Sequence, residues 1–290
     1  MSAKDSIRYL VFDIESVADP ALIAATRTNF ETEPAQALRE YRDELMEKKG
    51  SDFIPHTFQV PISLALGKVR DDFSLADITV LRVEDGGPRK ICERFWDGWR
   101  YYDRPTFVTF NGRGFDVPLM ELTAFRYGIQ IPEWFAVDKR SFDQPRNRYG
   151  SAHLDLYDFL TNFGATQFVS GLNVAAKILR KPGKIGTKGD MVQDMFDAGE
   201  LDEIHRYCRC DVLDAYFVFL RTQVLCGRIT PEREAELVDE TRRFLEDESV
   251  NEPIYATYLD AWDSADAYFA ENDVVAERVE AAKLNRVLKV

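Results

Sequence analysis

The segment Ile7-Arg-Tyr-Leu-Val-Phe12 restricts the fold most strongly, because it is almost continuously apolar and rich in residues that favour β-structure. Such a run predicts a strand buried on both faces, as in the interior of a sheet covered by helices. We expect the strand to end at Asp13, which places this carboxylate near the edge of the sheet. A central strand in a layered α/β domain is therefore the starting point for the rest of the chain.

The order of the following segments indicates the fold class. Residues 34–49 are charged and strongly helix-forming, and Gly50 follows where helices commonly end, so we expect an exposed helical insertion over about residues 24–55. Residues 59–69 and 78–83 predict an antiparallel pair of strands. Further elements are expected as a helix over 89–102, a strand over 106–110, a helix opened by Asp116, a short strand over 152–156 and a long helix over 201–225. This order predicts an α/β fold with a ribonuclease H-like mixed five-stranded sheet flanked by helices, with the first strand central.

The chain becomes acidic and rich in alanine after Gly227, with helices expected near 231–247, 254–271 and 274–288. We therefore expect a catalytic domain over residues 1–228 and an acidic helical C-terminal extension over residues 229–290 that offers a surface to a protein partner. The net charge of −13 counts against a nucleic-acid partner. However, residues 232–290 contain 16 acidic and 7 basic side chains, so most of the excess lies in the extension.

The composition of the 290 residues, 45% hydrophobic and 30% charged, is typical of a globular enzyme. No stretch approaches the roughly 20 apolar residues that cross a bilayer, so we expect a cytoplasmic protein without a membrane contact. Cys208 and Cys210 lie two residues apart in a helical pattern and point to different sides, which makes them a poor metal-binding pair. The sequence leaves the oligomeric state undetermined.

Three carboxylate motifs stand at the ends of elements that such a sheet brings together. They are Asp13-Ile14-Glu15, Asn111-Gly-Arg-Gly-Phe-Asp116-Val-Pro118 and Tyr207-Cys-Arg-Cys-Asp211. Asp13 and Glu15 share one face of an extended segment, because side chains alternate with period two. Tyr207 and Asp211 are four residues apart on a helix and are therefore neighbours.

Carboxylates grouped in this way suit the hydrolysis of a phosphodiester. The reaction requires an activated water and charge compensation at the leaving oxygen, and two hard cations roughly 4 Å apart supply both. Mg²⁺ and Mn²⁺ prefer oxygen ligands, and grouped acids repel one another unless a cation lies among them. We therefore expect two Mg²⁺ or Mn²⁺ ions as cofactors.

In this order the motifs resemble those of the DEDDy branch of the DEDD exonuclease superfamily. The resemblance covers roughly residues 7–228 and is closest to the predicted stand-alone 3′→5′ exonucleases related to the proofreading domain of family-B DNA polymerases. It implies that four carboxylates bind the two metal ions, namely Asp13, Glu15, Asp116 and Asp211, and that Tyr207 orients the water. The sister DEDDh branch has a histidine five residues before the last aspartate, but that position is Arg206 here, which favours the tyrosine version.

Other residues have candidate roles in which a structural alternative stays open. Asp155 is expected to support the metal ligands or to cap a helix, and a substrate contact is a third possibility. Asn111 belongs to the second motif, and Phe115 is a candidate wedge against the terminal base or a core residue.

Residues 177–190 carry five basic side chains and three glycines, and form a candidate track for the substrate backbone or an ordinary solvated loop. Lys184 and Lys188 are the candidate phosphate contacts in this loop. A second basic stretch over residues 140–149 contains Phe142 and Tyr149, which could stack on bases.

The expected activity is hydrolysis of single-stranded nucleic acid from the 3′ end, with release of nucleoside monophosphates. DNA is favoured as substrate because the resemblance is to the polymerase branch. An exoribonuclease that trims RNA, and a noncatalytic nucleic-acid-binding module on the same fold, are the alternatives.

Overall fold

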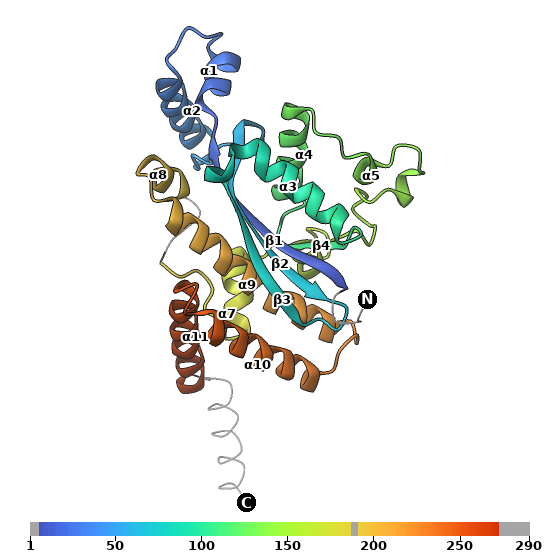
Figure 1. Cartoon of the computed structure of the whole chain (residues 1–290). Coiled ribbons are helices and arrows are strands. Elements are labelled where there is room, and N and C mark those ends of the chain that lie inside the picture. Colours follow the sequence, from blue (N-terminus) through green and yellow to red (C-terminus); the bar gives the residue numbers. More distant parts are fainter. Residues whose placement is uncertain (1–5, 187–190, 273–290) are drawn as a thin grey trace, which may run out of the picture.

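The computed structural model describes residues 6–186 and 191–272, and its centre is a mixed sheet with the strand order β3-β2-β1-β4-β5 (Figure 1). The strands are β1 (Ile7–Ala18), β2 (Gln59–Arg70), β3 (Leu75–Arg82), β4 (Thr106–Thr109) and β5 (His153–Asp155). β1, β2 and β3 pair antiparallel, whereas β4 lies parallel to β1 and β5 parallel to β4. The expected ribonuclease H-like five-stranded sheet flanked by helices, with the first strand central, is confirmed.

Helices cover both faces of this sheet, as the apolar first strand predicted. Leu10 and Phe12 of β1 pack in the core beneath α3 (Gly87–Tyr101) and α4 (Asp116–Tyr127). Val11 belongs to the opposite core, which lies against α9 (Leu201–Leu225). Because side chains alternate along a strand, Tyr9 and Val11 face α9 while Leu10 and Phe12 face away from it.

The expected end of the first strand at Asp13 is wrong, since β1 continues to Ala18. The reason is its pairing with β2, which runs from Ile7 opposite Arg70 to Ala18 opposite Gln59. The pairing with β4 on the other side reaches only Val11. Asp13 therefore lies inside the strand, at the point where the neighbour on one side has ended.

The expected helical insertion forms a hairpin of α1 (Pro20–Arg27) and α2 (Pro34–Lys49). Gly50 ends α2 in the left-handed conformation with φ of 68°, as its position predicted. The insertion is not exposed on all sides, because Tyr41 and Leu45 are buried against α1 and residues near it. An apolar stripe on a mostly charged helix accounts for this one-sided packing.

Four short helices among the described residues follow α4 in the chain and precede α9. They are α5 (Pro132–Phe135), α6 (Leu156–Thr161), α7 (Gly171–Ile178) and α8 (Val192–Asp197), with 3₁₀ turns at His56–Phe58, Val83–Asp85 and Ser141–Asp143.

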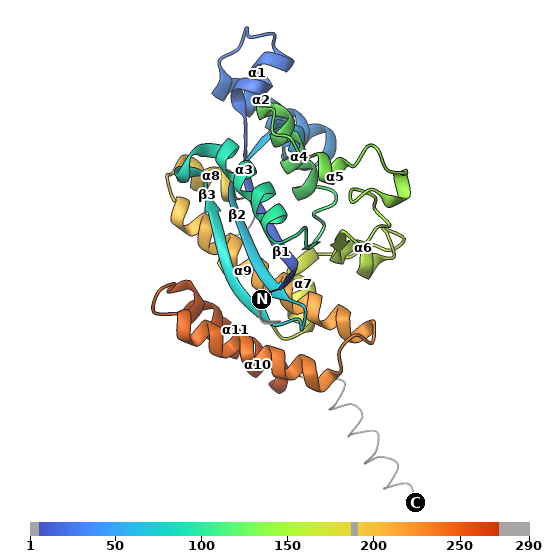
Figure 2. The same ribbon diagram turned by 45° about the vertical axis from the view of Figure 1, so that its right-hand side comes forward.

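Two helices of the acidic C-terminal segment, α10 (Pro231–Glu248) and α11 (Ile254–Glu271), lie beside α9 (Figure 2). Leu245 and Trp262 belong to the same core cluster as α9, and the Tyr258 hydroxyl donates to Asp214 Oδ1 at 2.6 Å. The helix expected over 274–288 lies outside the described residues. The division of the chain at residue 228 stays a prediction. Within the described ranges, no helix is long and apolar enough to span a membrane.

Candidate active site

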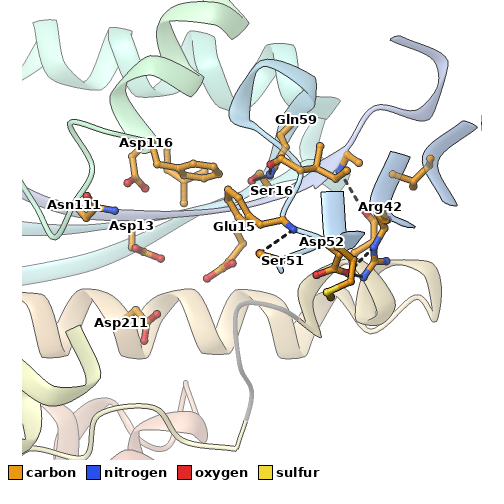
Figure 3. A pocket seen from close by; sticks show the side chains of 18 of the residues that line it. Asp13, Glu15, Ser16, Arg42, Ser51, Asp52, Gln59, Asn111, Asp116 and Asp211 are labelled. Carbon is orange, nitrogen blue, oxygen red and sulfur yellow. Dashed lines mark hydrogen bonds and ion pairs between the residues drawn. The ribbon is translucent and has the colours of Figure 1, made fainter. Parts of the chain in front are cut away.

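Carboxylates from three elements gather at one cavity between β1, α4 and α9 (Figure 3). Asp13 and Glu15 lie on the α9 face of β1, because they alternate with Phe12 and Ile14, which pack in the opposite core. Asp211 reaches the cavity from the middle of α9, and Asp116 from the first turn of α4. The cavity has a volume of about 590 Å³ and is lined by all four side chains.

Burial and mutual repulsion strongly disfavour the charged forms of these carboxylates. Burial raises the pKa of Asp116 to about 7 and the pKa of Asp211 to about 6. The pKa values of Asp13 and Glu15 also lie well above the ordinary range, first because of burial and then because of the neighbouring carboxylates. Four acids held together in this way form an unstable arrangement of charge that a cation would relieve.

Lys184 and Tyr207 lie close to the carboxylates. The exposed Lys184 ammonium lowers the pKa values of Asp13, Glu15 and Asp211, and its Nζ lies 5.8 Å from the centre of the Tyr207 ring. The Tyr207 hydroxyl lies beside the Asp211 carboxylate, one helical turn away. Burial and the adjacent acids raise the pKa of Tyr207, so its phenol stays neutral and can donate a hydrogen bond.

The position of Lys184 depends on a tight turn after α7. The Lys184 backbone N–H donates to Asn173 Oδ1 at 3.0 Å. Gly183, just before it, has φ of 63°, and a Cβ added there would lie 2.4 Å from the same Asn173 oxygen. The turn therefore requires glycine at position 183. Lys188 lies outside the described residues.

Asp155 organises the loop that carries the second motif. Its carboxylate accepts from the backbone N–H groups of Asn111 at 2.9 Å and Arg113 at 2.8 Å. The same carboxylate caps α6 by accepting from Tyr157 N at 2.9 Å. Of its three candidate roles, the structure thus shows a helix cap that also holds the loop before Asp116.

Asn111 and Phe115 line the cavity at the two ends of this loop, and Phe115 also packs against the core beneath α3 and α4. Asn111 adopts a left-handed conformation with φ of 65°. A Cβ at Gly112 would lie 2.5 Å from the Thr109 hydroxyl, so the close return of the chain over β4 requires glycine.

The second basic stretch contributes little free positive charge. Arg146 Nε lies 2.8 Å from Glu121 Oε1, and Arg148 lies 3.6 Å from Asp158. Arg140 pairs with Asp143 in the same loop. Local ion pairs therefore use these charges, and residues 140–149 do not extend the carboxylate cavity.

Sequence reasoning missed Cys208, which lies beside the first motif. Its thiol donates to the Asp13 carbonyl oxygen at 3.3 Å, and its Sγ and carboxylate oxygens of Asp13 and Glu15 all lie within 4.8 Å of one another. Burial and Asp13 raise the pKa of Cys208 well above its ordinary value, so the group stays a thiol, a poor metal ligand. The three-residue spacing from Asp211 on one helix face was a signal for this position.

The wall formed by α2 and the segment after it was also missed. Arg42, Met46, Asp52 and Phe53 line the same cavity as the carboxylates (Figure 3). No local pattern in the sequence indicates this contact, because α2 is separated from the second and third motifs by long stretches of chain. Charged and exposed helix positions read as a solvated surface.

Comparisons with known proteins identify the family of the chain. A family model described as "Predicted 3'-5' exonuclease related to the exonuclease domain of PolB" matches residues 51–262. A search of curated proteins finds no match. Among solved structures, the chain is similar to a family B DNA polymerase from the hyperthermophilic archaeon Pyrobaculum calidifontis, with 17% identity and a TM-score of 0.48. The similarity covers 75% of this chain and 24% of the polymerase chain.

Proposed function

Because the chain belongs to the family of predicted 3′-5′ exonucleases related to the exonuclease domain of PolB, we propose that it removes nucleotides from the 3′ end of single-stranded nucleic acid by two-metal-ion hydrolysis. The products are nucleoside monophosphates. The observation that supports the proposal most directly is the convergence of Asp13, Glu15, Asp116 and Asp211 on one cavity.

The donor set fits two divalent metal ions. All four side chains offer oxygen ligands, which Mg²⁺ and Mn²⁺ prefer, and the cluster is stable in its charged form only with a compensating cation. The thiol of Cys208 stays protonated, so the donor set is that of a hard cation. Bound Mg²⁺ or Mn²⁺ supplies an activated water and neutralises charge on the leaving oxygen.

Two residues of this chain act on the water and the phosphate. Tyr207 presents a neutral hydroxyl beside Asp211, where it can hold the attacking water. Lys184 is a flexible, exposed cation that faces the carboxylates, and its charge can pair with the phosphate that is cleaved. Asn111 and Phe115 line the path that the terminal nucleotide takes.

We propose DNA as the substrate because the family is described by its relation to the exonuclease domain of PolB. RNA is the competing substrate, since the carboxylates act on the phosphate and are indifferent to the sugar. The acidic outer surfaces of α10 and α11 are a proposed contact for a protein partner, because their apolar sides already pack against α9.

The activity test uses matched DNA and RNA oligonucleotides, each labelled at the 5′ end or at the 3′ end, with Mg²⁺ or Mn²⁺. We expect the 5′ label to give a ladder of shortening products and the 3′ label to appear at once in a mononucleotide. Asp13→Ala should abolish both, whereas Asp43→Ala, at an exposed position of α2, should not. Faster hydrolysis of RNA would reverse the substrate order. Binding without hydrolysis by the wild type would favour the noncatalytic module instead.

A further inference from the structure

The lining of the carboxylate cavity continues from the acids to α2 and includes an aromatic pair. Phe115, next to Asp116 in the chain, and Phe53, three residues after Gly50, both line it. Their ring centres lie 5.7 Å apart with the planes inclined at 52°. Phe53 nevertheless remains 61% exposed, so much of the residue is open to solvent.

The residues on either side of Phe53 are firmly anchored. Asp52 accepts from Arg42 Nε of α2 at 2.9 Å, and Ile54 is 7% exposed within the small core of the α1–α2 hairpin. The Phe53 N–H also donates to Ser51 Oγ at 3.3 Å. The backbone on both sides of Phe53 is fixed, so its ring stays exposed to water. This exposed apolar surface adds nothing to the hydrophobic stabilisation of the fold. Such an arrangement is preorganised for a ligand.

We propose that Phe53, together with Phe115, holds the base of the 3′-terminal nucleotide while its phosphate lies at the carboxylates. This inference rests on the proposed exonuclease function and adds a substrate-positioning residue to it. An open aromatic face binds a nucleobase by stacking, which tolerates any base because every base has a π-face. The volume of about 590 Å³ is that of a site for one small-molecule-sized group, such as a nucleotide, rather than a duplex.

The other residues of α2 and of the segment after it bear on how the terminal base is recognised. The charge of Arg42 is directed to Asp52, and the Gln59 amide donates to the Ile54 carbonyl oxygen. These contacts occupy part of the hydrogen-bonding capacity of Arg42, Asp52 and Gln59, and the Phe53 ring offers the base an apolar face. The α1–α2 hairpin thus gives the cavity a base-binding wall without sequence preference.

The experiment measures KM and kcat for hydrolysis of two DNA oligonucleotides that differ only in the 3′-terminal nucleotide, which is normal in one and abasic in the other. Phe53→Ala should raise KM for the normal oligonucleotide by about 5- to 150-fold, the range found when a stacking ring is removed. It should change KM for the abasic oligonucleotide by less than about twofold, because that substrate has no base to lose. Phe53→Tyr keeps a ring and should retain the wild-type KM.

The matched control is Phe30→Ala, in the same hairpin. Phe30 is 77% exposed, and it is not one of the described residues that line the cavity. It should leave both KM values unchanged. Equal effects of Phe53→Ala on the two oligonucleotides, or none on either, would overturn the inference while leaving the exonuclease intact. A wild-type protein that hydrolyses no oligonucleotide would instead remove the proposed function, and the inference with it.

Discussion

Asp116→Asn should stabilise the protein in the absence of divalent metal, although it removes a residue of the proposed active site. Burial raises the pKa of the Asp116 carboxyl from 3.8 to about 7, so the folded state binds its proton more tightly than the unfolded state does. The stability from this group is therefore greatest below pH 3.8 and is lost as the pH rises through 7. At pH 8 the ionised carboxylate lowers the free energy of unfolding by about 4 kcal/mol, at 1.36 kcal/mol for each pKa unit.

Asparagine has nearly the same shape and no charge, so the substitution should recover most of this free energy. In a chain of this size about 4 kcal/mol corresponds to a rise in melting temperature on the order of 10 °C. The assay is urea or thermal unfolding at pH 8 with a chelator, repeated at pH 4, where the variant should gain little. The control is Asp43→Asn, which changes the same charge at an exposed position.

Addition of Mn²⁺ provides the second half of the test. It should stabilise the wild type, because the ion binds the folded state, and should stabilise Asp116→Asn much less. The reasoning is refuted if the variant is no more stable than the wild type at pH 8 in chelator, or if Mn²⁺ raises both melting temperatures equally.

Three further outcomes are expected. His153, whose pKa burial lowers to about 3, stays neutral in the folded state, so the contribution of this group to stability should fall by about 1.4 kcal/mol for each pH unit below 6.5. The free energy of unfolding of His153→Gln, relative to that of the wild type, should therefore rise by about 2 kcal/mol in urea unfolding between pH 7 and pH 5. Tyr207→Phe should lower kcat by about 100-fold with little change in KM, as measured by steady-state hydrolysis. The variant lacks only the hydroxyl that positions the attacking water, whereas the groups that bind the substrate are unchanged. Trp262→Ala should cost about 3 to 5 kcal/mol in urea unfolding, and the exposed Tyr268→Ala almost nothing, if α11 belongs to the same cooperative unit as α9.

Local patterns in the sequence were sufficient for most of the elements. Helix-forming residues followed by Gly50 predicted α2 with its observed end, and the predicted bounds of the long helix over 201–225 are those of α9. Alternation along the first strand placed Asp13 and Glu15 on one face, and the four-residue offset placed Tyr207 beside Asp211. These features depend only on backbone periods, which nearby residues encode.

Contacts between distant segments required the folded chain. The length of β1 is set by pairing with β2, and the position of Cys208 beside Asp13 by the packing of α9 on the sheet. Only the tertiary structure brings Phe53 to Phe115 and joins the α1–α2 hairpin to the carboxylate cavity.

Patterns within the sequence thus predict the order of the elements and the face that Asp13 and Glu15 share. The tertiary structure decided which faces meet, how deeply the acids are buried and what forms the wall opposite them. The physical reason is that periodicity fixes the direction of a side chain relative to its own helix or strand, whereas its partners depend on packing between segments far apart in the chain.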